Sequence, residues 1–207
     1  MTQSVDAPPS GGDSPGAARH DPDADDSSAI AASLHDPDQF TVLYDRHAEA
    51  VYRYVAGRLG AQAADDVAAE TFLVAFRRRE RFDATRGSVR SWLFGIATRL
   101  VAQHRRAETR RYRALARVGA EREAAGHEDR VVTWVTAEGM QPRLASALAA
   151  LSAKERDVVL LAALSRLGHE EIAAALGIPY GTVGSRLNRA RRKLRAALGD
   201  TLDQEGL

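Results

Sequence analysis

The sequence predicts an all-α fold of two small helical domains joined by a flexible linker. Apolar residues recur at three- and four-residue spacing in two separate blocks, over about residues 36–106 and 143–199, and this spacing is typical of amphipathic helices. Residues 107–142 between the blocks are polar, are interrupted by glycines and have poor apolar periodicity, which indicates a linker. A chain of 207 residues that is 44% hydrophobic suits one or two small domains and leaves no room for a large enzyme core.

The amino-terminal segment is strongly acidic. Residues 1–38 hold eight acids and one base, a charge of −7, so the remainder of the chain carries +8. The segment is rich in Pro, Gly, Ser and Ala and has scarcely any large apolar residue, so burial cannot offset its ordering entropy. We therefore predict a disordered acidic tail over residues 1–35. It either keeps the protein soluble or shields the basic domains as a mimic of DNA.

Three helices are expected in the first block. Order begins at Asp36 and Pro37, an N-cap followed by proline at the first helical position, and the first long helix ends at Gly60. A second helix covers about residues 64–79. A loop over residues 81–87 leads to a third helix capped by Ser88, whose core face holds Trp92, Leu93, Ile96, Ala97 and Leu100. We interpret Trp92 as a core residue rather than as a platform for base stacking.

The second block has the pattern of a helix-turn-helix. Ser152 and Glu155 form a capping box that opens a scaffold helix. A short helix follows from His169 to Leu176, and Gly177 supplies a stop that tolerates left-handed backbone before a helix from Pro179 to Leu198. Two helices joined by a tight glycine turn are the DNA-binding motif.

The last helix of this motif has the composition of a DNA-reading element. Val183, Leu187, Ala190, Leu194 and Leu198 form one apolar stripe, and no acid occurs between Gly177 and Gly199. A solvated surface helix would usually mix charges of both signs. We therefore favour insertion into a DNA groove, driven by six cations: Arg186, Arg189, Arg191, Arg192, Lys193 and Arg195.

Composition excludes several other classes of function. The chain has no cysteine, so disulfides, thiolate zinc sites and cysteine nucleophiles are excluded. Its six histidines are scattered without metal-ligand spacing, and no phosphate-cradling glycine loop occurs. We therefore predict a protein that is not an enzyme, with no catalytic residue, metal, cofactor or small-molecule substrate. The chain lacks a signal peptide and a span of membrane-crossing length, so we expect a cytoplasmic protein without membrane insertion.

Four sequence blocks together resemble one known family. FTVLYDRHAEAVYRYVAGRLG, DDVAAETFLVAFRRRERF, SVRSWLFGIATRLVAQHRR and the C-terminal helix-turn-helix are similar, in order and spacing, to bacterial RNA polymerase sigma factors of the sigma-70 family, extracytoplasmic-function (ECF) group. The resemblance covers about residues 36–199. It implies that residues 36–106 are region 2, residues 107–142 a linker through the polymerase and residues 143–199 region 4, with a C-terminal tail over 200–207.

The resemblance also implies site residues. Region 2 would bind the clamp helices of the polymerase beta-prime subunit, and region 4 the beta flap. The polymerase-binding residues would be Asp66, Glu70, Thr71 and Phe72. Recognition of the minus-ten element and its melting would fall to Arg86, Arg90, Arg99, Gln103, His104, Arg105 and Arg106. Recognition of the minus-thirty-five element would fall to Thr182, Val183, Ser185, Arg186, Asn188, Arg189 and Arg192.

This chain departs from the family pattern at a few positions. The family often has glutamine in place of Ala69, asparagine and aspartate in place of Arg99 and Gln103, and a cation in place of Gly184. We expect the glycine to remove a phosphate contact and to weaken promoter binding.

The resemblance implies partners as well: core polymerase, promoter DNA of a signal- or stress-responsive gene set, and an anti-sigma factor. Two alternatives are a stand-alone helix-turn-helix regulator that binds DNA as a dimer, and a sigma-like decoy that sequesters an anti-sigma factor. Because the linker is long, we expect compact and extended arrangements of the two domains. An apolar patch at residues 131–135 of the linker either docks on a domain or meets a partner.

Overall fold

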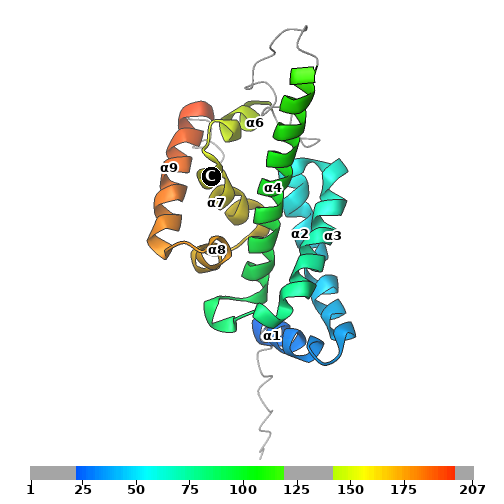
Figure 1. Cartoon of the computed structure of the whole chain (residues 1–207). Coiled ribbons are helices and arrows are strands. Elements are labelled where there is room, and N and C mark those ends of the chain that lie inside the picture. The colour runs from blue at the N-terminus through cyan, green and yellow to red at the C-terminus, as the bar shows by residue number, and fades with distance from the viewer. Residues whose placement is uncertain (1–21, 119–141, 199–207) are drawn as a thin grey trace, which may run out of the picture.

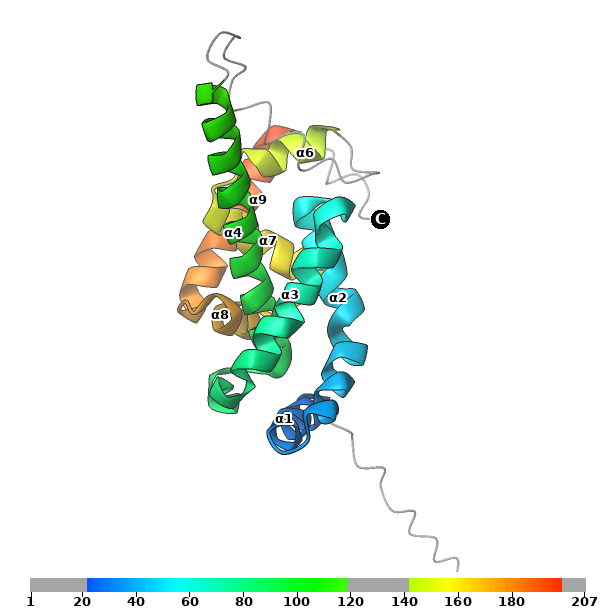
Figure 2. The ribbon, with the colours of Figure 1, turned by 45° about the vertical axis from the view of Figure 1, so that its right-hand side comes forward.

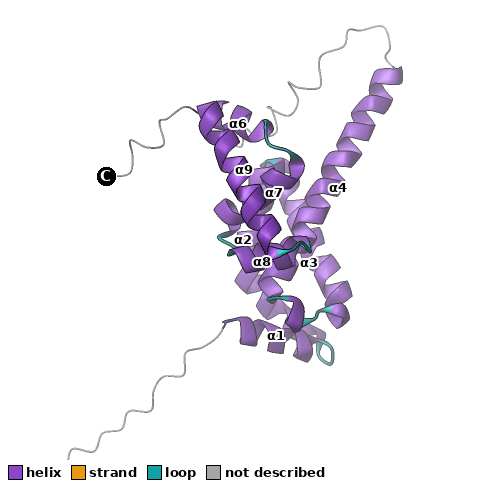
Figure 3. Ribbon diagram, turned by 90° about the vertical axis from the view of Figure 1, so that its left-hand side faces the viewer, coloured by secondary structure: helices purple, strands orange, loops and turns teal. Residues whose placement is uncertain are grey.

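The computed structural model describes residues 22–118 and 142–198, and within these ranges every regular element is helical (Figure 3). The predicted all-α class is therefore confirmed. The predictions for most of the acidic tail, for residues 119–141 of the linker with their apolar patch, and for the C-terminal tail lie outside the described residues.

The prediction of disorder up to residue 35 is wrong for its last third. Pro22–Ser33 forms helix α1, and Pro37–Phe40 forms a short 3-10 helix, η1. Asp26 and Ile30 on α1 are buried, and the Asp26 carboxylate accepts a hydrogen bond from Arg46 and lies 2.5 Å from His47 Nε2. A paired carboxylate and one apolar side chain thus anchor a helix that composition alone would leave unfolded. The predicted start at Asp36 is confirmed as the cap of η1, where the Asp36 side chain accepts a hydrogen bond from the Asp38 backbone.

Helices α2 (Thr41–Leu59), α3 (Ala61–Arg78) and α4 (Val89–Val118) form the N-terminal unit, with short 3-10 turns at Arg79–Arg81 and Ala84–Arg86 between α3 and α4. Gly60 joins α2 to α3 with a φ of 81°, as its predicted role as a helix stop requires. The interior is apolar and contains Leu43, Val51, Tyr54, Val55, Phe72, Leu93, Phe94 and Val101. Helix α4 runs on to Val118, so the first part of the predicted linker is helical (Figure 1).

The C-terminal unit contains α6 (Pro142–Ala149), α7 (Ala153–Ser165), α8 (His169–Leu176) and α9 (Tyr180–Leu198). The capping box of α7 is present. The Ser152 side chain accepts a hydrogen bond from the Glu155 backbone N–H, and the Glu155 side chain accepts one from the Ser152 backbone N–H. Gly177 ends α8 with a φ of 62°. Three predicted helices and their caps are confirmed, whereas α6 had not been expected.

The two units pack directly against each other. Helix α4 lies between α2 and α3 on one side and the C-terminal unit on the other, with α8 against α4 and α7 against α2 (Figures 1 and 2). The contact relies on glycine. A Cβ atom at Gly95 would lie 2.5 Å from the Ala175 carbonyl oxygen, and one at Gly57 would lie 2.5 Å from Leu164 Cδ1. Close backbone approach thus shapes this seam between the units.

Charged side chains cross the same seam. Arg58 of α2 is 3% exposed; its Nη2 donates to Asp157 Oδ1 of α7 at 2.6 Å and its Nη1 donates to Tyr54 Oη at 3.0 Å. Arg90 of α4 pairs with Glu171 of α8 at 3.3 Å and donates to the Ser165 carbonyl. A buried charge without a partner is costly, so the Arg58–Asp157 pair ties the packing of the units to one specific geometry.

Candidate nucleic-acid interface

Helix α9 buries its predicted apolar stripe. Val183, Leu187 and Ala190 are buried, and Leu194 packs against the same core. Val183 is fully buried, so its predicted contact with DNA is wrong: it lies on the face that packs inside the unit, at the start of the stripe. The helix is therefore held rigidly, with its other face turned to solvent.

The remaining predicted residues lie on or beside that outer face. Ser185, Asn188, Arg189 and Arg192 are exposed, and Thr182 and Arg186 are half-buried. The Ser185 hydroxyl donates to the Thr182 carbonyl at 3.0 Å. Guanidinium, amide and hydroxyl groups on one helix face supply the donors and acceptors that read base edges in a major groove.

One carboxylate opposes the cations of α9, which the sequence analysis had not foreseen. Glu155 of α7 accepts a hydrogen bond from Lys193 Nζ at 2.8 Å, and its other oxygen lies 3.9 Å from Arg189 Nε. The hydrogen bond from Lys193, followed by those from Ser152, lowers the pKa of the Glu155 carboxyl to about 2. The sequence of α9 contains no acid and gave no sign of this contact, because the carboxylate belongs to α7.

A second cationic surface lies on α4 and on the turn before it. Arg86, Arg99, Gln103 and Arg106 are exposed, as a role in contacting DNA requires. His104 is half-buried, and its Nε2 lies 3.6 Å from Glu108 Oε1, one turn along α4.

Two of the residues predicted to contact the minus-ten element form hydrogen bonds within the protein instead. Arg105 is half-buried and its Nη2 donates to the Arg58 carbonyl at 2.6 Å. Burial, together with the positive charges of Arg58 and Arg156, lowers the pKa of Arg105 to about 10, so it remains charged at neutral pH. Arg90 is held in the seam by Glu171 and Ser165. In this arrangement both guanidinium groups are engaged by the protein itself, so their prediction as free DNA contacts is corrected.

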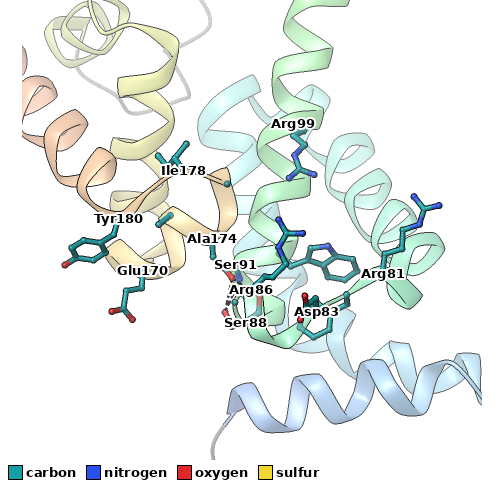
Figure 4. A pocket seen from close by; sticks show the side chains of 15 residues that line it. Arg81, Asp83, Arg86, Ser88, Ser91, Arg99, Glu170, Ala174, Ile178 and Tyr180 are labelled. Carbon is teal, nitrogen blue, oxygen red and sulfur yellow. Dashed lines mark hydrogen bonds between the residues drawn. The ribbon is translucent and has the colours of Figure 1, made fainter.

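A cleft of about 650 Å³ lies between the turn before α4 and the helix-turn-helix (Figure 4). Arg86 and Arg99 reach it from the N-terminal unit, and Ile178 and Tyr180 from the helix-turn-helix. Trp92 also lines it while packing on Phe82 at a ring-centroid distance of 5.3 Å. The core role predicted for Trp92 is thus correct for part of the ring, and the other part faces the cleft.

The polymerase-binding prediction on α3 separates into two faces. Asp66 and Glu70 are exposed. Thr71 and Phe72 are buried, and the Thr71 hydroxyl donates a hydrogen bond to the Val67 carbonyl. These two side chains cannot contact a partner, so their predicted role in polymerase binding is wrong. Leu73, 46% exposed beside the two acids, is the apolar residue that α3 offers instead.

Comparison with known proteins agrees with this geometry. The Sigma-70 region 2 family model matches residues 43–111, and the Sigma-70, region 4 model matches residues 142–194. The chain is 36% identical, over 157 residues, to the ECF RNA polymerase sigma factor SigL of Mycobacterium tuberculosis, covering 75% of this chain and 86% of that relative.

Two solved structures show the same fold. One is CnrH in complex with the cytosolic domain of CnrY, at 26% identity and a TM-score of 0.58, with 87% of this chain and 99% of that chain covered. The other is the sigma factor RpoE in complex with the anti-sigma factor NepR from Bartonella quintana, at 22% identity and a TM-score of 0.55, with 78% and 98% covered.

These findings define a helical protein of transcription initiation with a DNA-binding helix-turn-helix in region 4. The chain belongs to the ECF RNA polymerase sigma factors. Members of this family are specificity factors and not enzymes. Across the residues that the structure describes, no helix is both long and apolar enough to span a bilayer.

Proposed function

We propose that this protein binds core RNA polymerase in the cytoplasm, directs it to the promoters of a specific, signal-responsive gene set and promotes melting of their DNA. The observation that carries the proposal is the pairing of two cationic surfaces in one chain of this family. One is the exposed face of α9, and the other is the turn and outer face of α4.

Region 4 reads the minus-thirty-five element in this proposal. Arg189 and Arg192 are exposed on α9 above a buried apolar stripe, so the helix can enter the major groove without unfolding. Asn188 and Ser185 supply shorter contacts on the same face. Arginine pairs with guanine through two parallel hydrogen bonds, so Arg189 and Arg192 contribute most to discrimination between bases.

Region 2 reads and opens the minus-ten element. Arg86, Arg99 and Arg106 neutralise phosphates of the separated strands, and Gln103 offers an amide to an extruded base. Trp92 and Phe82 border the cleft next to these cations and supply an apolar wall. Holding separated strands needs both features, because flipped bases lose their stacking partners and the bound phosphates need cations beside them.

Core polymerase binds the exposed face of α3. Asp66 and Glu70 provide carboxylates that pair with a basic partner surface, and Leu73 provides exposed apolar area beside them. Rim charges of this kind set the encounter rate and the register of an interface. The beta-prime clamp helices are the partner proposed for this face, and the beta flap for region 4.

An anti-sigma factor is the proposed negative regulator. The solved relative RpoE is bound to the anti-sigma factor NepR, and CnrH is bound to a domain of CnrY. We propose that such a partner favours the arrangement in which regions 2 and 4 are packed together, since Arg90 is then held by Glu171 and the Ser165 carbonyl and is withheld from a promoter.

The division of labour is tested in holoenzyme assembled from purified core polymerase. Asp66→Lys should weaken binding to core without changing DNA contacts, whereas Glu49→Lys, an exposed acid on α2, is the matched control and should not. Arg99→Ala should lower permanganate reactivity of unpaired thymines at the promoter while core binding is kept. Arg53→Ala on α2 controls for loss of one exposed arginine. Equal effects of a variant and its control would contradict the assignment.

A further inference from the structure

Glu155 has a position that its capping role does not require. Its Oε2 accepts hydrogen bonds from the Ser152 backbone at 2.9 Å and the Ser152 hydroxyl at 2.8 Å, which completes the capping box of α7. The same oxygen accepts from Lys193 at 2.8 Å, and Oε1 lies 3.9 Å from Arg189 Nε. The Glu155 side chain is 8% exposed, whereas those of Lys193 and Arg189 are about half exposed.

The carboxylate is thus fixed on α7 and faces two cations of the recognition helix α9. Because the capping hydrogen bonds fix its rotamer, Glu155 holds its charge in one place while the ends of Lys193 and Arg189 reach toward it. The atom of Arg189 nearest to the carboxylate is Nε. The two terminal guanidinium nitrogens of Arg189, Nη1 and Nη2, are the pair suited to parallel hydrogen bonds with guanine O6 and N7.

We propose that Glu155 is a specificity-determining positioning residue of region 4. It restrains Lys193 and Arg189, so that Arg189 is presented in one orientation for base reading and neither cation is free to follow phosphates on unrelated sequences. The inference deepens the proposed function, because it rests on α9 reading the minus-thirty-five element.

The physical reason is the difference between the two kinds of binding. Non-specific affinity comes from cations that neutralise phosphates and release counterions, whatever the sequence. Base discrimination needs a side chain held in the productive geometry by its surroundings. Because Glu155 bonds Lys193 and lies near Arg189, it weakens the first kind of contact and orders the second. It thereby raises the ratio of specific to non-specific affinity.

The test variant is Glu155→Gln in the full chain. The amide oxygen still accepts from the Ser152 backbone, so the cap is kept while the charge is removed. Ser152→Ala is the matched control, because it damages the cap and keeps the charge. Lys193→Gln and the double variant Glu155→Gln/Lys193→Gln show whether the effect passes through Lys193.

Two measurements separate positioning from structural support. The first is the salt dependence of holoenzyme binding to a 30-base-pair duplex of random sequence. Releasing two cations should make Glu155→Gln lose about tenfold more affinity than wild type between 50 and 200 mM salt. In the double variant Glu155→Gln/Lys193→Gln only Arg189 is released, so about half of the added salt dependence, on a logarithmic scale, should remain. The second is selection from a library randomised at the minus-thirty-five element, where Glu155→Gln holoenzyme should select a less biased set of sequences.

The outcomes distinguish this inference from the proposed function. If wild-type holoenzyme selects a sequence and Glu155→Gln selects the same one with an unchanged salt dependence, the role of Glu155 is structural and the inference is overturned. A Ser152→Ala variant that shifts both readouts as Glu155→Gln does would also overturn it. If wild-type holoenzyme selects no sequence at all, the proposed function itself fails.

Discussion

Gly95→Ala is the substitution that tests the packing of regions 2 and 4 most sharply. A Cβ at this position would lie 2.5 Å from the Ala175 carbonyl oxygen, and ordinary contacts begin at 3.4 Å, so α8 has to move away from α4 by about 0.9 Å. The obstacle is backbone rather than a flexible side-chain end, so it cannot turn aside. Overpacking of this kind costs about 1–3 kcal/mol.

The same substitution stabilises helix α4 itself. Alanine in a helix interior is favoured over glycine by roughly 0.5–1 kcal/mol. Region 2 should therefore become slightly more stable in both the packed and the separated molecule, so this gain does not offset the weaker contact between the regions. The overpacking cost of about 1–3 kcal/mol alone raises the ratio of separated to packed molecules by about 5- to 150-fold.

Distance measurements between the regions give the assay. The chain has no cysteine, so single cysteines at Glu49 on α2 and Asn188 on α9, both exposed, can carry a fluorescent pair. Gly95→Ala should shift the population toward longer distances. Gly184→Ala on α9, where a Cβ meets nothing within 4 Å, is the control and should raise stability without changing distances. Identical distances in Gly95→Ala and wild type, with a stability gain like that of the control, would refute the reasoning.

Further substitutions test three individual contacts. Asp157→Asn leaves Arg58, which is 3% exposed, without its carboxylate partner and should lower the free energy of unfolding by about 3 kcal/mol in a denaturant titration. Arg58→Met removes the buried charge itself and should cost less. The reverse order would contradict the buried ion pair. Asp26→Ala should release α1 and cost about 1–3 kcal/mol, seen as faster amide exchange in α1, and unchanged protection there would show that the carboxylate is not its anchor. Because the pKa of Glu155 is lowered from its ordinary 4.5 to about 2, its contribution to stability is complete above pH 4.5 and disappears as pH falls toward 2. Glu155→Gln should flatten the acid unfolding curve in that window, and an unchanged curve would argue against the ion pair.

Much of the helical framework follows from the sequence because its signals are local. The capping box at Ser152 and Glu155, the stops at Gly60 and Gly177 and the stripe from Val183 each involve residues within a few turns of one another. Helix α1 is different. It buries Ile30 and depends on an ion pair between Asp26 and residues twenty positions further on, so composition alone predicted disorder.

The errors at the sites have a common cause. A family motif gives the position of a residue along the chain, whereas contact with a partner depends on which face of the helix the residue occupies. Val67, Ala68, Thr71, Phe72 and Ala75 recur at helical spacing, and this periodicity already indicated that Thr71 and Phe72 face the core. Val183 could be corrected by the same argument, since the apolar stripe of α9 starts there.

Other features had no signal in the sequence. Segments far apart along the chain meet in the hydrogen bonds of Arg90 and Arg105, in the close approach at Gly95 and in the contact of Glu155 with Lys193. Such contacts depend on how the units pack, and no periodicity or cap within a single helix encodes them.

The most direct test of the central claim is run-off transcription with purified core polymerase, using DNA from upstream of the gene for this chain as template. Polymerase with the protein should give a discrete transcript that is absent without it, and the start site would then locate the minus-ten and minus-thirty-five elements. If the protein shows no binding to core polymerase and no transcript depends on it, the assignment as a promoter-specificity factor is contradicted, and a stand-alone regulator or a decoy would take its place.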